Sequence, residues 1–276
     1  LRHLLVRRAH FTGQILVDLV TADYDGSSEF DEAELIGGFR DALLALNLEG
    51  ELAGILHTRN NSLSDTIKDE GTEVLYGQDF FYEKILGLSF KITPFSFFQT
   101  NSAGAEKLYG KAREYLLEAL HGDKPHEVFD LYSGTGTITQ IVSEYAEHVT
   151  GVEIVPEAVQ AAEENAAANG ITSCSFICGD VFRVLDGLDE KPDYIIVDPP
   201  REGLQPKALS KIVGYEVPSL LYIACKPASL ARDIPTFITH GYEVKHLACV
   251  DMFPRTNNTE CVCLFVKTGD GALRHQ

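Results

Sequence analysis

The sequence lacks any apolar run that approaches the roughly 20 residues needed to cross a lipid bilayer. Its opening residues, LRHLLVRRAH, also lack the apolar core and the small-residue cleavage site of a secretory signal peptide. These absences argue against an integral membrane protein and against a secreted one. We therefore expect a cytoplasmic protein.

Cysteine pairs with the spacing of a zinc site are also absent from the sequence. A chain of 276 residues is long enough to form a core without disulfide staples. We therefore expect neither a metal site nor a disulfide framework. Four cysteines lie in strand-like runs and are predicted to be core residues: Cys174, Cys178, Cys261 and Cys263.

Basic residues are scarce, because 23 Lys and Arg stand against 41 Asp and Glu, which gives a formal net charge of -18. Nucleic-acid-binding proteins usually contact phosphates through clustered Lys and Arg, so this balance argues against such a partner. This argument does not exclude a nucleic-acid partner, because net charge is a property of the whole chain. Basic residues do gather in two groups, the first being Arg2, Arg7 and Arg8 and the second Arg201, Lys226, Arg232 and Arg255. The alternative interpretation is scattered surface charge.

Residues 1–92 are predicted to form a small α/β domain. Strand-like runs (LLVRR, QILVDLV and LAGILH) are mixed with one helical stretch, FDEAELIGGFRDALLALNL, whose apolar residues recur at three- and four-residue spacing. The polar segments TADYDGSSE and TRNNSLSD are predicted to be turns. The sequence opens with Leu1 inside an expected strand, so we expect it to be part of a longer protein.

Residues 93–276 show a different pattern, in which strand, loop and helix alternate several times. This alternation is typical of a parallel sheet with helices on both faces. A leading helix is predicted in SAGAEKLYGKAREYLLEALHG, with Asn101 or Ser102 as its cap and Gly122 as its stop. The expected strands are EVFDLY, HVTGVEI, SCSFICGD, DYIIVDPP, LLYIACKP, YEVKHLACV and CVCLFV. Seven strands that end in a hairpin indicate a Rossmann-like α/β domain with a mostly parallel sheet.

The segment DLYSGTGTI places small residues where a strand ends and a helix begins. Gly134 and Gly136 are therefore the positions where the backbone is expected to come closest to a ligand. Glu153 ends the next strand, where an acidic side chain can accept both hydrogens of a ribose diol. Asp180 and Asp198 end the third and fourth strands. Acids at three successive strand ends predict a cleft for a nucleoside-bearing ligand.

S-adenosylmethionine and NAD are two nucleoside-bearing ligands that fit such a cleft. The fingerprint for a pyrophosphate requires a third glycine, whereas Thr137 and Ile138 follow Gly136 here and the turn has no third glycine. Asp130 precedes the turn, where an acid would repel a pyrophosphate but could hold the cationic end of a methionine moiety. S-adenosylmethionine is therefore the favoured cofactor, and NAD in an oxidoreductase is the alternative.

The loop Asp198-Pro-Pro-Arg201 is similar to the Asp-Pro-Pro-aromatic loop of enzymes that methylate amino groups. Arg201 replaces the aromatic residue that would stack on a flipped base, which weakens the case for an amino-group target. The alternative interpretation is a rigid Pro-Pro strand end.

Cys225 follows the apolar run LLYIA and precedes Lys226-Pro227, at the edge where the cofactor acids are expected. A lone cysteine after a strand is more often a small buried apolar residue. The neighbouring charges favour a reactive thiol instead, because Lys226, and Arg201 or Arg232, would stabilise the nucleophilic thiolate.

Glu260 stands at a loop-to-strand junction in DMFPRTNNTECVCLF, and alone it could be a surface carboxylate. Together, Cys225 and Glu260 provide a nucleophile and a base. This pair suits methyl transfer to C5 of uracil, which becomes nucleophilic only after a thiolate has added at C6. A carboxylate placed over C5 would then remove its proton, and elimination of the cysteine would release the product.

Five motifs occur in the order that they have in the RNA uracil-C5 methyltransferases: FSFFQTNSAGAEKLY, DLYSGTG, DPPREGL, CKPASLARD and DMFPRTNNTE. The chain resembles that family over essentially its whole length. The resemblance implies that residues 1–92 are the family's central domain. It implies that residues 93–276 are a class I methyltransferase domain that uses S-adenosyl-L-methionine.

The resemblance also implies roles for single residues. Cys225 would be the nucleophile and Glu260 the base that takes the C5 proton. The family's cofactor positions would fall on Gln99, Tyr132, Gly134, Thr137, Glu153, Asp180 and Asp198. Basic residues beside the motifs are expected to contact the substrate: Arg201, Lys226 and Arg255.

The sequence departs from the family's pattern beside the chemical motifs. Ala224-Cys225-Lys226-Pro227 replaces Ser-Cys-Asn-Pro, and Arg255 and Asn258 replace two usual histidines. Lys226 could lower the pKa of the thiol or contact phosphate, and it could also mark an altered substrate or a weakened enzyme. The β-barrel RNA-binding domain (TRAM) and the iron–sulfur cysteines that precede the central domain in many relatives are absent from this sequence.

The expected partner is RNA, with the target uridine flipped out of a single-stranded loop. The resemblance favours 23S ribosomal RNA, and transfer RNA is the nearest alternative. Neither DNA nor a membrane is expected as a partner, and the protein is expected to be monomeric. A second hypothesis is a cofactor-binding, RNA-associated module that has lost catalysis.

Overall fold

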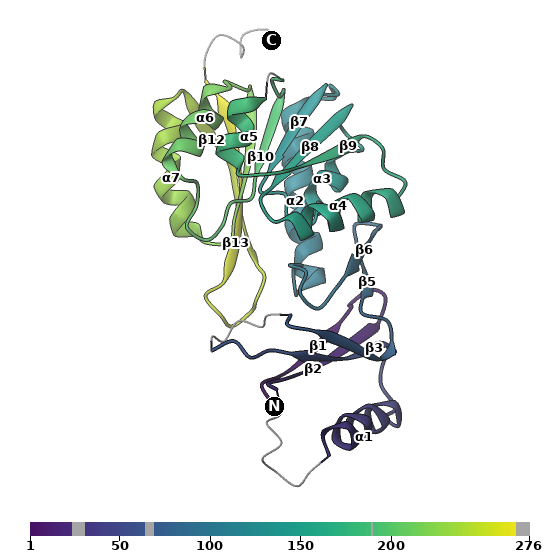
Figure 1. The fold of residues 1–276 in the computed structure, drawn as a ribbon. Coiled ribbons are helices and arrows are strands. Elements are labelled where there is room, and N and C mark those ends of the chain that lie inside the picture. Colours follow the sequence, from purple (N-terminus) through teal and green to yellow (C-terminus); the bar gives the residue numbers. More distant parts are fainter. Residues whose placement is uncertain (24–30, 64–68, 189, 269–276) are drawn as a thin grey trace. The chain divides into compact units, whose positions relative to one another are not determined.

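The computed structural model describes residues 1–23, 31–63, 69–188 and 190–268. The chain divides into two compact units, the first formed by residues 1–84 and 89–96 and the second by residues 85–88 and 97–276 (Figure 1). Within the described ranges, none of the helices combines the length and the hydropathy that a membrane span requires. The predicted turn segments TADYDGSSE and TRNNSLSD lie partly outside the described residues, at 24–29 and 64–65.

The first unit contains a four-stranded sheet and one helix. Its strands are arranged in the order β1 (His3–Arg8), β2 (Gln14–Thr21), β3 (Glu51–Arg59) and β4 (Thr72–Gly77). Strands β2 and β3 are parallel, and the two outer pairings are antiparallel. Helix α1 (Glu32–Leu44) lies in the connection from β2 to β3 and begins at Asp31, whose side chain accepts hydrogen bonds from two backbone N–H groups of the first turn. The expected helical stretch is thereby confirmed.

A hairpin of β5 (Phe81–Ile85) and β6 (Leu88–Ile92) links the two units along the chain. Its turn, residues 85–88, belongs to the second unit. Within that unit, the backbone N–H of Leu86 donates a hydrogen bond to the Glu106 carboxylate at 2.8 Å.

The second unit contains a seven-stranded sheet in the order β12-β13-β11-β10-β7-β8-β9. The strands are β7 (Glu127–Leu131), β8 (His148–Glu153), β9 (Cys174–Cys178), β10 (Tyr194–Val197), β11 (Ser219–Ala224), β12 (Tyr242–Asp251) and β13 (Thr259–Lys267). Strands β7 to β11 are parallel, whereas β13 is antiparallel to both β11 and β12. The mostly parallel α/β sheet with a final hairpin is therefore confirmed.

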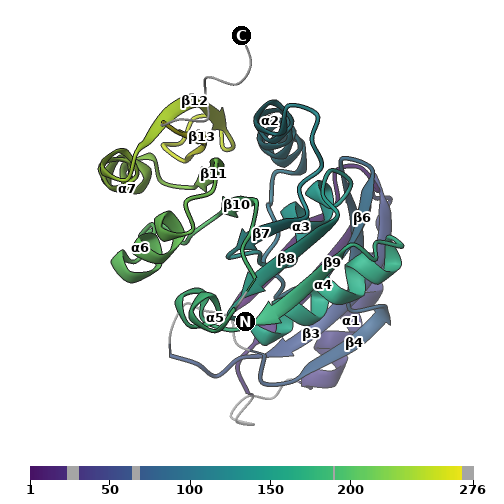
Figure 2. The same cartoon turned by 90° about the horizontal axis from the view of Figure 1, so that it is seen from above.

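Helices cover both faces of this sheet (Figure 2). They are α2 (Ser102–Leu120), α3 (Thr137–Val142), α4 (Pro156–Ala168), α5 (Val181–Gly187), α6 (Pro206–Gly214) and α7 (Pro227–Thr239). Buried residues of α5, α6 and α7 share one core with alternate residues of the central strands, such as Leu131, Val197 and Ala224. Helix α2 packs against β11, β12 and β13 and against α3. The intervening strand residues therefore face the side of α2 and α3.

Helix α2 begins and ends close to its predicted limits. The Asn101 side chain accepts a hydrogen bond from the N–H of Gly104 at 3.0 Å, which confirms Asn101 rather than Ser102 as the cap. His121 takes a left-handed conformation at φ 49°, and Gly122 follows at φ 89°. The last helical residue, Leu120, is thus followed by the cap His121 and then by the predicted stop, Gly122.

Two of the four cysteines predicted to be core residues are not buried. Cys261 and Cys263 lie in the core, whereas Cys174 is half-buried and Cys178 is exposed. The reason is the position of β9, which is the edge strand of the sheet. An apolar run in the sequence indicates a strand, but it does not indicate whether neighbours cover that strand on both sides.

Strand order determines where ligands can bind. The chain passes from β7 to β8 and β9 on one side and later to β10 and β11 on the other, so the order reverses between β7 and β10. Open α/β sheets bind ligands at the carboxyl ends of their strands beside such a reversal. Because β13 runs antiparallel to β11, the first residues of β13 lie at this same edge.

Candidate active site

A glycine turn follows β7 at the carboxyl edge of the sheet. The backbone N–H groups of Tyr132 and Ser133 both donate to the carbonyl of Val152 in β8, at 2.9 and 3.0 Å. Tyr132 has φ 67°, Gly134 has φ 54° and Gly136 has φ 73°, so three residues of the turn have left-handed backbone. A methyl group added at Gly134 would meet nothing within 4 Å. This turn therefore presents backbone to open space at the position predicted for a ligand.

Gly136 does not have the role predicted for it. A methyl group at this position would lie 2.7 Å from the Phe176 ring and 2.8 Å from Ala162. Gly136 has φ 73° and precedes α3, whose first residue, Thr137, is buried. The small residue is required for close packing of the turn against β9 and α4, not for approach to a ligand.

Glu153 ends β8 beside the glycine turn. Its Oε2 accepts a hydrogen bond from the N–H of Gly134 at 3.0 Å, and its Oε1 accepts from the N–H groups of Ile154 and Val155 at 2.8 and 3.0 Å. Three backbone donors hold the carboxylate at the predicted position. A ribose diol would approach the lone pairs that these N–H groups leave available.

Asp130 lies inside the protein and not at the cleft surface. Its side chain is fully buried, and its Oδ2 accepts a hydrogen bond from the Thr139 hydroxyl at 2.6 Å. Its Oδ1 has no hydrogen-bond partner among the described residues. Burial, opposed by the bond from Thr139, raises the pKa of Asp130 to about 6. The expectation that this carboxylate directly holds a cationic group is therefore wrong, because its side chain has no exposed surface.

Tyr132 and Asp180 come from different strands and lie near each other. Asp180 caps α5 by accepting a hydrogen bond from the N–H of Arg183 at 3.1 Å. Burial and the negative charge of Asp180 together raise the pKa of Tyr132 to about 12. The two predicted cofactor residues therefore border one region above the sheet.

Asp198 follows β10 and faces the side of α2 and α3. Its neighbour Val197 belongs to the core on the opposite face, so alternation along the strand directs Asp198 away from that core. Burial, then Glu260 and Asp130, raise its pKa well above the usual carboxyl value. The negative charges of Glu260 and of Asp130, in β7, therefore both act on Asp198.

Cys225 and Glu260 are brought together by strand register. Ala224 of β11 pairs with Cys261 of β13 in the antiparallel ladder. Cys225 is the next residue after Ala224, and Glu260 is the residue before Cys261, so the two stand opposite each other. Ala224 and Cys261 belong to the core beneath α5 to α7, and Cys225 and Glu260 therefore face the other side, with Asp198.

The charges around Cys225 differ from those expected. Burial, Glu260 and Asp198 raise the pKa of the thiol, and Arg201 is the side chain that lowers it. Lys226 is exposed and is not among the groups that act on the thiol. The expectation that Lys226 favours the thiolate is therefore wrong.

Arg232 also has a different role from the predicted one. It pairs with Asp233 at 2.9 Å and donates to the carbonyl of Glu202 at 2.6 Å. Asp233 is buried and accepts hydrogen bonds from the N–H of Leu204 and from the Tyr222 hydroxyl, at 3.0 and 2.8 Å. These contacts hold the loop that follows Arg201. Arg232 and Asp233 of α7 therefore stabilise the backbone beside the candidate site.

Arg201 is the basic residue that reaches the reacting pair. Its guanidinium donates to the side-chain amide oxygen of Asn258 at 3.4 Å, and its charge lowers the pKa of Glu260, which burial raises. Arg255 has φ 72° in the loop before β13 and is exposed, as is Lys226 at the start of α7. All three predicted substrate contacts are exposed, and Arg201 is the one whose charge acts on Cys225 and Glu260.

Gln99 is connected to the site through a residue that the sequence did not single out. Tyr109 of α2 is buried, and the Gln99 side chain acts to lower its pKa against the larger effect of burial. Burial and the charges of Asp198, Glu260 and Asp130 raise the pKa of Tyr109. A tyrosine in the apolar stripe formed by Ala105, Leu108 and Ala112 is the sequence signal that could have identified it.

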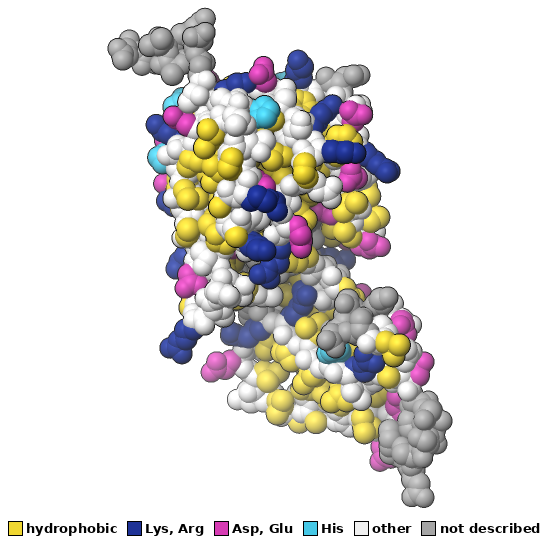
Figure 3. Space-filling model, turned by 90° about the vertical axis from the view of Figure 1, so that its left-hand side faces the viewer, with side chains coloured by type: hydrophobic (Ala, Val, Ile, Leu, Met, Phe, Trp, Pro, Cys, Tyr) yellow, Lys and Arg dark blue, Asp and Glu magenta, His cyan; other side chains and the backbone are white. Residues whose placement is uncertain are grey.

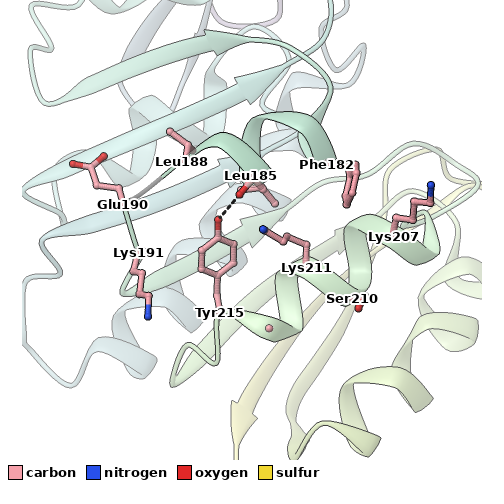
Figure 4. Close-up of a pocket in the computed structure, with 10 residues that line it drawn as sticks. Phe182, Leu185, Leu188, Glu190, Lys191, Lys207, Ser210, Lys211 and Tyr215 are labelled. Carbon is pink, nitrogen blue, oxygen red and sulfur yellow. Dashed lines mark hydrogen bonds between the residues drawn. The ribbon is translucent and has the colours of Figure 1, made fainter.

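A hollow of about 420 Å³ lies elsewhere, between α5 and α6 (Figure 4). Its lining includes Phe182, Lys207 and Tyr215, whose hydroxyl donates to the carbonyl of Leu185 at 3.2 Å. Lys211, also in the lining, forms an ion pair with Asp186 at 3.1 Å. None of the predicted site residues lines this hollow, so it is separate from the candidate site.

Comparison with known proteins identifies similar chains. The model of the tRNA (Uracil-5-)-methyltransferase family matches residues 67–268. An uncharacterized RNA methyltransferase of Clostridium acetobutylicum is 47% identical over 265 residues, which are 96% of this chain and 56% of the relative. One of Caldanaerobacter subterraneus is 46% identical over 269 residues, which are 97% of this chain and 57% of the relative. The chain therefore spans about half the length of the curated relatives it matches.

A solved structure shares the fold over nearly the whole chain. It is the Pyrococcus abyssi tRNA (uracil-54, C5)-methyltransferase in complex with S-adenosyl-L-homocysteine. The two structures superpose with a TM-score of 0.75 at 25% sequence identity, over 95% of this chain and 59% of the other.

Proposed function

Because this chain belongs to the tRNA (uracil-5-)-methyltransferase family, we propose that its protein methylates C5 of uracil in RNA, with S-adenosyl-L-methionine as methyl donor. The observation that carries the proposal is the position of Cys225 opposite Glu260, at the carboxyl edge of the sheet. A nucleophile and a base on the same side of the sheet are the two groups that carbon methylation of uracil requires.

The residues at the carboxyl edge fit the proposed methyl donor. Gly134 exposes backbone to open space, and Glu153 and Asp180 present carboxylates at the ends of β8 and β9. Tyr132 and Thr137 flank the glycine turn, while Gln99 and Asp198 lie on the side of the reacting pair. When bound there, S-adenosyl-L-methionine would supply an electrophilic methyl group. The absence of a third glycine in the turn argues against NAD, the alternative ligand.

Cys225 and Glu260 would divide the chemistry between them. The Cys225 thiolate would form a bond to C6 of uracil, and the ring electrons would move onto the C4 carbonyl as an enolate. C5 would then form a bond to the methyl group as the bond between that methyl group and the sulfonium sulfur breaks, which would leave a neutral thioether. Glu260 would accept the C5 proton, and the C5–C6 double bond would re-form as the bond from C6 to Cys225 breaks. Each bond that forms is matched by one that breaks, so no oxidant or reductant is needed.

The proposed substrate is 23S ribosomal RNA, with transfer RNA as the alternative. The resemblance in sequence motifs favours ribosomal RNA, and the family description and the Pyrococcus abyssi protein point to transfer RNA. On the face shown in Figure 3, basic side chains are interspersed with acidic and apolar ones. The basic residues beside the chemical motifs would supply the phosphate contacts near the site: Arg201, Lys226 and Arg255. The target uridine would be flipped out of a loop.

Methylation assays with defined RNAs test the proposal. The chain is incubated with labelled cofactor and unmodified transcripts of 23S ribosomal RNA and of transfer RNA, and the nucleosides are then identified by mass spectrometry. We expect 5-methyluridine in one of the two RNAs. Cofactor binding without methylation of either RNA, by this chain and by its full-length parent, would instead support a cofactor-binding module that has lost catalysis.

A further inference from the structure

Cys249 and Cys261 form a pair of thiols that the proposed chemistry does not use. They stand directly opposite each other in the antiparallel ladder of β12 and β13, and their sulfur atoms are 3.5 Å apart. Both are free cysteines in the structure. Two thiols in contact can be joined by oxidation, which isolated thiols cannot.

The strand geometry suits a disulfide between the two residues. Directly paired residues of antiparallel strands have Cα atoms about 4.5 or 5.5 Å apart, depending on the hydrogen-bond pattern. A disulfide bridges Cα separations of about 4.4 to 6.8 Å, so either pattern is suitable. The sulfur atoms, now 3.5 Å apart, would approach by about 1.5 Å to reach the S–S bond length. Side-chain rotation can supply this movement without a change in strand register.

The two thiols differ in their access to solvent. Cys249 is exposed, whereas Cys261 is buried with 2% of its surface exposed. Burial and the neighbouring Cys249 raise the pKa of Cys261, which keeps this thiol in its protonated form. A dissolved oxidant therefore reaches Cys249 first, and Cys261 lies in contact with it as the second thiol. An accessible thiol beside a second one is the usual arrangement of redox-sensitive cysteines.

The remaining cysteines are placed differently. Cys174 and Cys178 lie in β9, at the opposite edge of the sheet. Cys263 stands opposite a leucine of β12. Cys225 faces the other side of the sheet from Cys261. Within the part of the chain that the structure describes, Cys249 is therefore the thiol that is positioned to pair with Cys261.

We propose that Cys249 and Cys261 are a modification site, at which a peroxide converts the two thiols to a disulfide. The Cys249 sulfur would attack one peroxide oxygen, the O–O bond would break, and a sulfenic acid would form as water is released. The Cys261 sulfur would then bond to that of Cys249 as the S–O bond breaks, and the departing hydroxide would take the Cys261 proton as a second water. Two thiols are oxidised and one peroxide is reduced, so atoms and electrons balance.

The disulfide would close the hairpin of β12 and β13 beside the candidate site. It would join the two ends of segment 249–261, which contains Arg255 and Glu260. Cys261 is packed in the core and also pairs with Ala224 of β11, so the exposed Cys249 would make most of the movement. The modification is independent of the proposed function, because neither thiol takes part in methyl transfer.

The test treats the reduced full chain with hydrogen peroxide, blocks the remaining thiols with iodoacetamide and digests the protein with trypsin. Cleavage after Lys245 and Arg255 places Cys249 and Cys261 in different peptides. We expect mass spectrometry of the monomeric protein to detect these two peptides joined by a disulfide. In Cys261→Ser the pair should be lost, and dimedone should trap a sulfenic acid at Cys249.

Two matched controls remove other thiols. Cys178→Ser removes an exposed thiol, as Cys249→Ser does, and Cys263→Ser removes a buried thiol of β13, as Cys261→Ser does. The linked peptides should form in both controls and in neither variant of the proposed pair. The proposal would be overturned if the wild type forms no linked peptides at a peroxide dose that oxidises glutathione in a parallel sample. Linked peptides that survive Cys261→Ser, or that occur only between two chains, would also contradict it.

Discussion

Cys225 stands opposite Glu260 at the ends of two neighbouring antiparallel strands, one residue beyond the pair formed by Ala224 and Cys261. Both side chains face the side of the sheet that α2 covers, and neither belongs to the core beneath α5 to α7. Burial raises the pKa of each group, and Arg201 opposes that rise in both. The proposed chemistry therefore involves the charge of Arg201 acting on a half-buried thiol and a buried carboxyl group.

The variant Glu260→Gln should separate the two halves of the reaction. The neutral amide of this variant cannot accept the C5 proton, while addition of Cys225 and methyl transfer do not require that proton to leave. Turnover should fall by roughly 10²- to 10⁴-fold, the usual contribution of a general base. The protein–RNA adduct should accumulate on unmodified uridine RNA and be visible by denaturing electrophoresis. Slow turnover without any adduct would count against Glu260 as the base.

The variant Arg201→Gln should make the thiol harder to ionise. Arg201 lowers the pKa of Cys225, so its removal moves that pKa further upward. A thiol reacts as the thiolate, so at neutral pH the reaction with iodoacetamide should become slower and its pH profile should shift to higher pH. The rate is followed by mass spectrometry of the peptide that contains Cys225.

Lys226→Gln is the control for this comparison. It also removes one positive charge, but Lys226 is exposed and does not act on the thiol. Its pH profile should therefore match that of the wild type. Equal shifts in the two variants would show that net charge, and not the position of Arg201, determines thiol reactivity.

Asp130 should make the folded chain less stable as pH rises from about 4 to 6. Its pKa is raised in the fold from 3.8 to about 6, so the folded state binds more protons than the unfolded state in this window. Stability is therefore lost with increasing pH. Asp130→Asn should raise the free energy of unfolding at pH 7 by up to about 3 kcal/mol, with a smaller gain at pH 4. Thermal melts across this range measure both effects, and a lower melting temperature at pH 7 would contradict the assignment.

Gly136 and Gly134 should respond differently to alanine. Both have positive φ, which costs an alanine about 1–2 kcal/mol. At Gly136 the new methyl group would also press against Phe176 and Ala162, which adds about 1–3 kcal/mol. We therefore expect Gly136→Ala to lower the free energy of unfolding by about 2–5 kcal/mol, clearly more than Gly134→Ala. Denaturant titration distinguishes them, and equal losses would mean that packing at Gly136 is unimportant.

Much of the fold could be predicted from the sequence, because it depends on local patterns. Apolar runs separated by helical segments indicate the seven strands, and Asn101 is recognisable as a cap because its side chain acts within one turn. The order of the strands depends on packing between distant segments. For this reason Cys178 was predicted to be a core residue, although its strand lies at the edge of the sheet.

The site could be predicted in its chemistry but not in its electrostatics. Cys225 and Glu260 are identifiable because the proposed reaction needs a thiol and a base, yet their register depends on β13 running antiparallel to β11. Lys226 is adjacent to Cys225 in sequence, but it stands before the first turn of α7 and is exposed. Tyr109 was missed because the charges that act on it, those of Asp198 and Glu260, come from segments that are far from it in the sequence.

The most direct test of the account is a trapping experiment with RNA that contains 5-fluorouridine. A base can remove a proton from C5 but cannot remove fluorine from it. A ring that the enzyme has attacked and methylated should therefore remain bonded to the enzyme. With cofactor present, the wild-type chain or its full-length parent should form a covalent adduct, whose mass maps to the Cys225 peptide. Cys225→Ala should form none. An adduct that survives this substitution would contradict the assignment of Cys225 as the nucleophile.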